Sequence, residues 1–207
     1  MMRHTGPKNK ISRREAMDLG LKTPGSKSQA SLLRRLNVLP GQHGTRGRRK
    51  QSERSKQLRE KQKLRFIFGI TEKQLKGYFQ KAMNIKGNTG VLLGQLLEKR
   101  LDNVVYRLGF APTRASARQL VNHGHFTVNG RLMNIPSYKV EINDKIGFRK
   151  QKTAKIPYVE TSLSSKDTLI PAWVAKEGIA GKLLAEPTSE DIEKQVNLRS
   201  VVEYYSR

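Results

Sequence analysis

Residues 100–148 change their hydrophobic period once, from helical to strand-like, and this change most constrains the fold. Apolar residues first recur on one face of a 3.6-residue helix, at Leu101, Val104, Val105 and Leu108. Gly109 then favours a helix end, and Thr113 is a suitable N-cap for a second helix over residues 114–122. The first part of this run is therefore predicted to be a helix, a turn and a second helix.

After the second helix, apolar and polar residues alternate over residues 126–128, which indicates a strand. Asn129 and Gly130 follow, and this pair suits a type I′ hairpin turn because both central residues of that turn need positive φ. Further short strands are expected at residues 140–142 and 146–148. The whole run predicts a compact α+β unit with an antiparallel sheet.

The charge of this run is one-sided. No Asp or Glu occurs between residues 103 and 139, whereas the basic residues there are Arg107, Arg114, Arg118, Arg131 and Lys139. Arg114 and Arg118 lie four apart, so they share a helix face and destabilise the helix unless an anion lies opposite. A solvated basic face would explain one such pair, but an acid-free run of this length favours contact with phosphate groups.

The charge of the whole chain points to a polyanionic partner. Its 207 residues carry 41 Lys and Arg against 17 Asp and Glu, a formal net charge of +24. An excess of this size repels itself in a compact state unless an anion compensates it. Residues 158–207 hold six basic and eight acidic residues, so the first 157 residues hold 35 basic and nine acidic ones. We therefore expect the anion-binding surface in the first three quarters of the chain.

Several classes of protein are disfavoured. No apolar run of about 18 residues exists, so we expect no membrane span, and the basic N-terminus has no apolar segment of a signal peptide. The chain has no Cys, which excludes disulfides and thiolate metal sites and suits the cytosol. His123 and His125 have no third ligand nearby, so we expect no bound metal, no cofactor and no small-molecule substrate.

The remaining segments predict three parts. Residues 1–44, broken by Pro, Gly and Ser, are expected to form a basic extended arm with one or two short helices, in which Ser12 and Glu15 have the spacing of a capping box. Residues 45–99 form a helical domain, completed by a C-terminal helix at 196–207 that packs back on it. Residues 100–195 form an α+β domain, with an RNA-binding module at 100–160. The fold class is thus α+β.

A dense basic run follows a glycine-rich turn at residues 40–44, which exposes backbone N–H groups. Between residues 45 and 65 there are ten Lys and Arg and only two Glu. Such a run is often a solvated helix face or a disordered tail. Its place after the turn, in so basic a chain, favours a loop and helix that contact RNA.

One triplet suggests an enzyme. Arg100-Leu101-Asp102 resembles the catalytic Asp segment of pseudouridine synthases, some of which carry a related RNA-binding module. Asp102 also lies in the first turn of a predicted helix, where a carboxylate interacts favourably with the helix dipole or can pair with a neighbouring Arg. The Thr-Ser-Gly context of that family is absent, and the chain leaves no room for a second, catalytic core. We therefore expect no enzymatic activity, with an RNA-modifying enzyme or assembly factor as the alternative.

Several motifs in order resemble the S-four family of bacterial small-subunit ribosomal proteins. They are Gly6-Pro7-Lys8, Ser12-Arg13-Arg14-Glu15, Pro40-Gly41-Gln42-His43-Gly44, and the segments at 58–63, 86–90, 101–107, 113–121 and 128–131. The resemblance covers nearly the whole chain. The module at 101–148 alone would not distinguish this family from modifying enzymes or synthetase appendages.

The resemblance implies a structural constituent of the small ribosomal subunit. Members bind a multi-helix junction in the 5′ region of small-subunit rRNA, nucleate assembly and lie where mRNA enters, with an effect on translational accuracy; in some bacteria they repress their own operon. The implied partners are rRNA, neighbouring small-subunit proteins and mRNA, in cytoplasmic ribosomes. Some relatives fold the arm around zinc held by four Cys, so this Cys-free chain resembles the zinc-free type.

The candidate RNA-binding residues combine the matching motifs with the basic runs. They are Arg3, Lys8, Arg13, Arg14, Gln42, His43, Arg46, Arg48, Arg49, Lys50, Arg59, Lys61, Lys63, Lys86, Asn88, Arg107, Thr113, Arg114, Arg118, Gln119, His123, Asn129 and Arg131. By position, Arg46, Arg48, Arg49 and Lys50 would face the incoming mRNA. A DNA-binding helix-turn-helix protein is less favoured, because the basic residues spread over two lobes and an arm.

Overall fold

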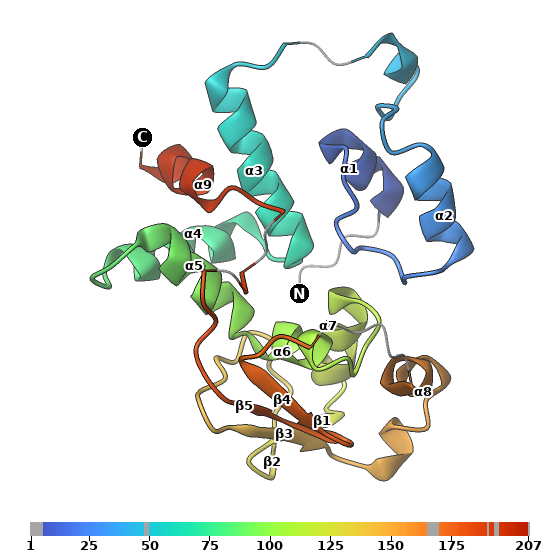
Figure 1. The fold of residues 1–207 in the computed structure, drawn as a ribbon, viewed down its shortest axis with the longest axis vertical. Helices are drawn as coiled ribbons and strands as arrows, with labels where there is room; N and C mark the ends of the chain where they lie inside the picture. Colours follow the sequence, from blue (N-terminus) through green and yellow to red (C-terminus); the bar gives the residue numbers. More distant parts are fainter. Residues whose placement is uncertain (1–5, 48–49, 165–169, 190, 193–194, 207) are drawn as a thin grey trace. The chain divides into compact units, whose positions relative to one another are not determined.

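The computed structural model describes residues 6–47, 50–164, 170–189, 191–192 and 195–206. The chain divides into two compact units (Figure 1). Unit 1 comprises residues 1–90 and 195–207, and unit 2 comprises residues 91–194. Residues 91–99, which the sequence analysis assigned to the helical domain, therefore belong with unit 2.

Unit 1 is helical where it is described. Its helices are α1 (Lys8–Glu15), α2 (Lys27–Arg34), the 3₁₀ turn η1 (Gly44–Arg46), α3 (Glu53–Ile67), α4 (Glu72–Met83) and α9 (Leu198–Tyr205). Side-chain caps begin most of them: Ser26 caps α2, Ser52 caps α3, Thr71 caps α4 and Asn197 caps α9. The predicted capping box at Ser12 is wrong, because α1 already begins after Pro7, whose fixed φ of −67° suits a helix start.

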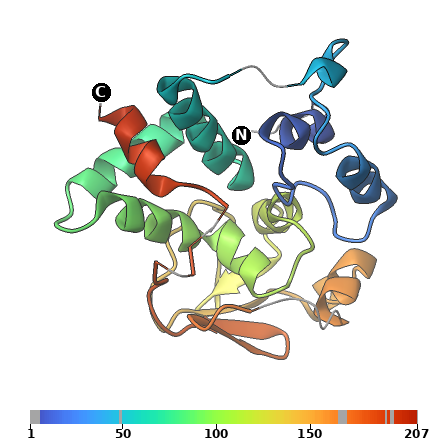
Figure 2. The same cartoon turned by 45° about the horizontal axis from the view of Figure 1, so that its top comes forward.

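The C-terminal helix packs back on the helical domain, as predicted, and α9 lies beside α3 in both views (Figures 1 and 2). The Tyr205 ring stacks on Phe79 with a centroid distance of 4.9 Å. Its hydroxyl donates to Oε1 of Glu72 at 2.7 Å, and Nζ of Lys61 donates to the same oxygen at 2.8 Å. One carboxylate therefore connects α3, α4 and α9.

Unit 2 is an antiparallel sheet with helices. Its elements are α5 (Thr89–Glu98, whose first two residues count with unit 1), α6 (Leu101–Arg107), α7 (Arg114–Asn122), β1 (Phe126–Val128), β2 (Arg131–Leu132), β3 (Lys145–Phe148), η2 (Gln151–Thr153), α8 (Pro157–Ser164), β4 (Val174–Glu177) and β5 (Ala180–Leu183). The strand order is β2-β1-β3-β5-β4, with Val128 opposite Ile146 in the central pair. The predicted α+β class is confirmed.

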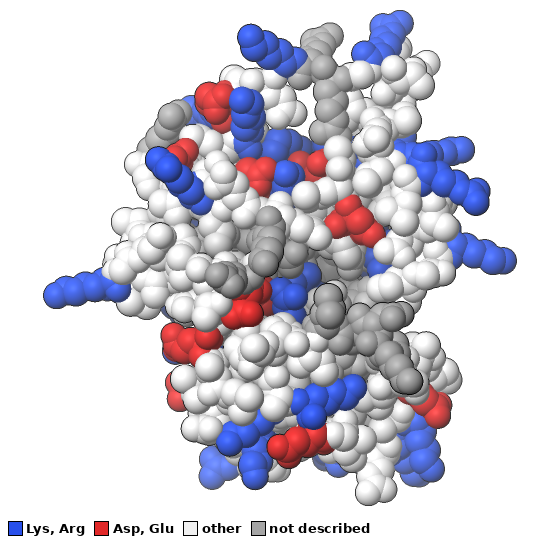
Figure 3. All heavy atoms as spheres, viewed as in Figure 1, with Lys and Arg blue, Asp and Glu red and all other residues white. Residues whose placement is uncertain are grey.

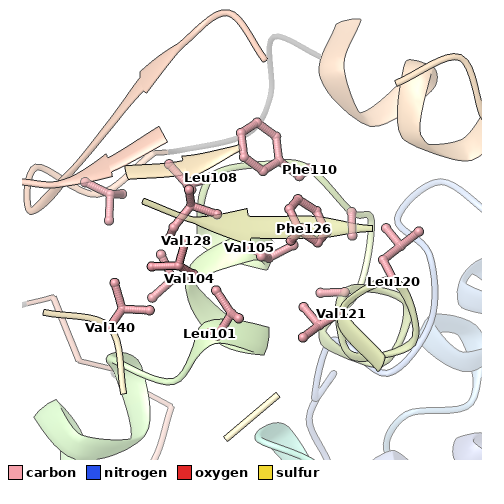
Figure 4. Close-up of a cluster of buried hydrophobic side chains, with 14 of the residues drawn as sticks. Leu101, Val104, Val105, Leu108, Phe110, Leu120, Val121, Phe126, Val128 and Val140 are labelled. Atoms are coloured by element: carbon pink, nitrogen blue, oxygen red, sulfur yellow. The ribbon is translucent and has the colours of Figure 1, made fainter. Parts of the chain in front are cut away.

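The core of unit 2 lies between α6, α7 and the sheet (Figure 4). Leu101, Val104, Val105 and Leu108 of the predicted helical face are fully buried, together with Phe110 and Phe126. Helix and sheet approach closely at Gly181, where an added Cβ would lie 2.4 Å from Cδ1 of Leu108. Glycine at this position therefore allows β5 to pack against the end of α6.

The local signals in residues 100–148 are mostly confirmed. Thr113 caps α7 in a capping box with Ser116, and the β1–β2 turn has φ of 50° at Asn129 and 78° at Gly130. The strand predicted at residues 140–142 is wrong. Val140 instead donates its N–H to the carbonyl of Lys99 at 2.9 Å, and the chain then turns through residues 142–143.

In the part of the chain that the structure describes, no helix is long and apolar enough to cross a bilayer.

Replacing Tyr205 by Phe tests the contact that fastens α9. Burial alone would raise the pKa of Glu72, but the hydrogen bonds from Lys61 and Tyr205, together with the charges of Lys61 and Arg65, lower this pKa below its ordinary 4.5. Loss of the Tyr205 hydroxyl should lower the free energy of unfolding by about 1 kcal/mol at neutral pH, since the Glu72 side chain remains partly solvated. Urea unfolding measures the loss.

The same variant has a predicted pH dependence. A carboxylate with a depressed folded-state pKa stabilises the fold above pH 4.5 and loses that contribution as the pH falls through its folded value. The difference between wild type and Tyr205→Phe should therefore shrink below pH 4.5. Tyr204→Phe is the control, because it keeps the ring that Lys61 faces at 4.7 Å. An equal loss in both variants, or a pH-independent one, contradicts this account.

Candidate nucleic-acid interface

Lys and Arg side chains project from the surfaces of both units (Figure 3). Many of the basic residues predicted to bind RNA nevertheless have an internal partner.

Glu98, at the end of α5, is fully buried in unit 2 and accepts hydrogen bonds from two residues of α6. Arg107 forms a bidentate pair with it, with Nη2–Oε1 at 2.7 Å and Nε–Oε2 at 3.0 Å. Asn103 donates from Nδ2 to Oε2 of the same carboxylate at 2.6 Å. A buried carboxylate is costly without such partners, so the pair is expected to stay formed. Because two hydrogen bonds of Arg107 are made to the same carboxylate, the pair also fixes the orientation of the Arg107 guanidinium.

Asp102 is the second buried carboxylate of unit 2. Arg100 donates to it from Nε at 3.0 Å and from Nη2 at 2.7 Å, and Nε of Arg118 lies 3.2 Å from Oδ2. Both oxygens of Asp102 are thus engaged, which makes it a structural anchor. This pairing also corrects the view that no acid offsets the Arg114 and Arg118 charges, since α6 supplies one across the helix interface.

Arg114 is held by a relay of hydrogen bonds. Its Nε donates to Oδ1 of Asn103 at 2.8 Å, while Nδ2 of Asn103 binds Glu98. Its guanidinium group also lies 4.7 Å from the Tyr106 ring centroid. Glu98, Asn103 and Tyr106 therefore position Arg114 at the start of α7 and leave it partly exposed. The sequence analysis missed all three, because no local pattern signals contacts between α5, α6 and α7.

The other predicted residues of unit 2 lie around the end of α7 and the β1–β2 hairpin. Gln119, His123 and Arg131 are exposed, and Arg131 has no acidic partner within the described residues. Asn129 is exposed but engaged, donating to Asp144 at 2.7 Å and accepting from the Lys145 N–H at 2.9 Å. Thr113 is buried as the α7 cap.

His125 lies beside His123, with ring centroids 6.3 Å apart, and its Nδ1 is 3.1 Å from Oγ1 of Thr153. The pKa of His125 is lowered from its ordinary 6.5, first by burial and then by the positive charges of His123 and Lys150. At neutral pH this imidazole is therefore uncharged and offers polar rather than ionic contacts. Among the described residues no group of three or more His, Asp or Glu is arranged to hold a metal ion.

In unit 1, three predicted cations of α3 pair with carboxylates. Arg59 binds Glu15 at 3.0 Å, Lys61 binds Glu72 at 2.8 Å and Lys63 binds Glu60 at 2.6 Å. Arg13 of α1 instead donates to the carbonyls of Val38 and Leu39, at 2.9 and 3.0 Å. These four basic side chains therefore stabilise unit 1 through their internal partners.

The exposed predicted residues of unit 1 are Arg14, Gln42, His43, Arg46, Lys50, Lys86 and Asn88, and Lys8 is half-buried. Arg3, Arg48 and Arg49 lie outside the described residues. In the glycine-rich turn, Gly44 donates its N–H to the carbonyl of Gly41 at 3.3 Å. The turn therefore uses at least this N–H itself, where the sequence analysis had expected exposed N–H groups.

Comparison with known proteins covers the whole chain. The family described as ribosomal protein S4/S9 N-terminal domain matches residues 3–98, and the S4 domain matches residues 99–146. Small ribosomal subunit protein uS4 of Persephonella marina is 48% identical, that of Aquifex aeolicus 47% and that of Herpetosiphon aurantiacus 45%. In each case the similarity spans 100% of this chain and 100% of the relative.

Arg107 and Arg131 should respond differently to replacement by Ala. Arg107→Ala leaves the carboxylate of Glu98 buried with a weaker set of donors, so the free energy of unfolding should fall by about 3–5 kcal/mol. Arg131→Ala removes an exposed charge, so stability should change by less than about 0.5 kcal/mol. Its effect should appear as weaker binding to a 5′ fragment of small-subunit rRNA.

Urea unfolding and filter binding of each variant provide the comparison. For Arg131→Ala the slope of log affinity against log salt should become shallower by about one, as for one lost phosphate contact. Equal destabilisation by the two substitutions would show that the Glu98 pair does not hold the fold.

Proposed function

Since this chain belongs to the uS4 family of small ribosomal subunit proteins, we propose that it binds a multi-helix junction in the 5′ region of small-subunit rRNA and nucleates subunit assembly there. The chain is a ribosomal protein with an S4 RNA-binding domain and not an enzyme. Junction binding is supported mainly by three arginines that internal partners hold in place. Glu98 holds Arg107, Asn103 holds Arg114 and Asp102 holds Arg118.

A pre-positioned arginine cluster suits structured RNA. Such RNA is recognised mainly by its shape, through phosphate and 2′-hydroxyl contacts. A guanidinium group presents several donors in a rigid plane that matches phosphate oxygens. Because the cluster is ordered without RNA, binding requires less loss of side-chain entropy.

Unit 1 contributes a second basic surface in this proposal. Arg46 and Lys50, around η1, are exposed, and we place them toward the incoming mRNA, where they would influence translational accuracy. The arm of residues 1–44, the helical domain with the C-terminal helix, and the α+β domain would contact different parts of the junction. Neighbouring small-subunit proteins complete the partners, in cytoplasmic ribosomes.

Two rival functions receive no support from the site. A pseudouridine synthase would need a carboxylate open to substrate, whereas both oxygens of Asp102 bind arginines. A DNA-binding helix-turn-helix protein would place its basic residues around one groove-reading helix, whereas the exposed cations of this chain occur on both units.

Filter binding with a junction RNA and a DNA duplex of equal length tests the proposal. The junction RNA should bind at least tenfold more tightly, which corresponds to about 1.4 kcal/mol. Its affinity should fall steeply with salt, by about 10³-fold or more between 50 and 200 mM if six or more phosphates are contacted. Equal affinity for both nucleic acids would refute junction recognition.

A further inference from the structure

A hollow of about 330 Å³ lies between α1 and α3 of unit 1. The two helices face each other in the views of Figures 1 and 2, and the Arg59–Glu15 ion pair joins them at its edge. Ile11 and Phe66 form apolar parts of its wall, and Lys10, Arg14 and Arg65 supply positive charge. Its volume lies at the small end of ligand pockets, which span about 300–1,000 Å³.

Two polar atoms in this wall lack a partner. Oε1 of Gln62 and Nε of Arg65 are buried, and neither makes a hydrogen bond within the described residues. One is an acceptor and the other a donor, and both belong to side chains that line the hollow. Buried polar groups without partners are rare and costly, so a ligand with both a donor and an acceptor would stabilise this wall.

Flat groups in the same wall suit a planar ligand. The Arg65 guanidinium lies over the Phe66 ring, with its central carbon 4.6 Å from the ring centroid. Aromatic rings and guanidinium planes both stack on unpaired nucleic-acid bases. A base edge also carries donors and acceptors side by side, as Gln62 and Arg65 require.

The charge around the hollow favours a phosphate. Lys10 and Arg14 are exposed at the rim, whereas the one acidic residue of the wall, Glu15, has a side chain only 1% exposed and is paired with Arg59 at 3.0 Å. Burial raises the pKa of Glu15 above its ordinary 4.5. The ion pair with Arg59 compensates the negative charge of Glu15, so this residue opposes a bound phosphate little.

We propose that this hollow binds one unstacked RNA nucleotide, with the base between Gln62, Arg65 and Phe66 and a phosphate at Lys10 and Arg14. The proposal rests on the RNA-binding function above and adds a nucleotide-specific site to it. A peptide carboxylate fits less well, because it offers no donor to the Gln62 oxygen.

Ultraviolet crosslinking of the full chain to the 5′ fragment of small-subunit rRNA, with the crosslinked peptides mapped by mass spectrometry, tests this site. A nucleotide should be attached to the peptide that contains Phe66. Gln62→Leu removes the unpaired acceptor at similar volume and should lower RNA affinity about tenfold while the variant stays folded. Gln80→Leu, on an exposed position of α4, is the matched control and should bind as wild type.

Three results would overturn the proposal. Wild-type affinity of both Gln62→Leu and Phe66→Leu, without a crosslink at Phe66, would remove the site but leave junction binding intact. Competition by inorganic phosphate that equals competition by nucleoside monophosphates would indicate an anion site without base contacts. A poly-glutamate peptide that binds wild type, but not Gln62→Leu, would assign the hollow to an acidic protein segment. Failure of the wild type to bind junction RNA would instead refute the proposed function itself.

Discussion

The carboxylates of Glu98 and Asp102 are buried in unit 2, and the arrangement of its basic residues depends on them. A buried carboxylate is tolerated only with close, hydrogen-bonded cations, so each of the two recruits arginines from α6, α7 or the chain between α5 and α6. Those arginines are then ordered in the absence of RNA. In a chain with a net charge of +24, the few acidic residues thus determine where many of the positive charges lie.

The same arrangement recurs in unit 1. Glu15 and Glu72 each receive a cation from α3, and Glu72 also fastens the C-terminal helix through Tyr205. The basic residues therefore fall into two groups, with different consequences of substitution. The paired ones stabilise the fold and orient the surface. Exposed ones such as Arg14, Arg46 and Arg131 are the residues that we propose to neutralise RNA phosphates, with release of counterions.

Local signals in the sequence predicted most of the elements in residues 100–148. Three of these signals depend on neighbouring residues alone, and each is confirmed. They are the helical spacing of apolar residues in α6 and α7, the Thr113 cap and the Asn129-Gly130 turn. The strand expected at 140–142 was wrong because a contact with the chain at Lys99 replaces sheet pairing there. Likewise, the predicted site residues could be chosen by charge, and the expected pairing of Asp102 with a neighbouring Arg is confirmed at Arg100. The pairs Glu98–Arg107 and Asp102–Arg118 could not be predicted, because these residues meet only in the folded chain. The hollow at Gln62 and Arg65 also depends on α1 meeting α3, and no pattern within either helix signals it.

The carboxylates of Glu98 and Asp102 order their arginine partners before RNA binds. Hydrogen exchange of the arginine Nε–H groups, followed by NMR in the RNA-free protein, measures this order directly. The Nε–H groups of Arg100 and Arg107, which bind Asp102 and Glu98, should exchange far more slowly than that of the exposed Arg131. Exchange at one common, rapid rate would show that these arginines are mobile in the free protein and become ordered only on RNA, which contradicts the account.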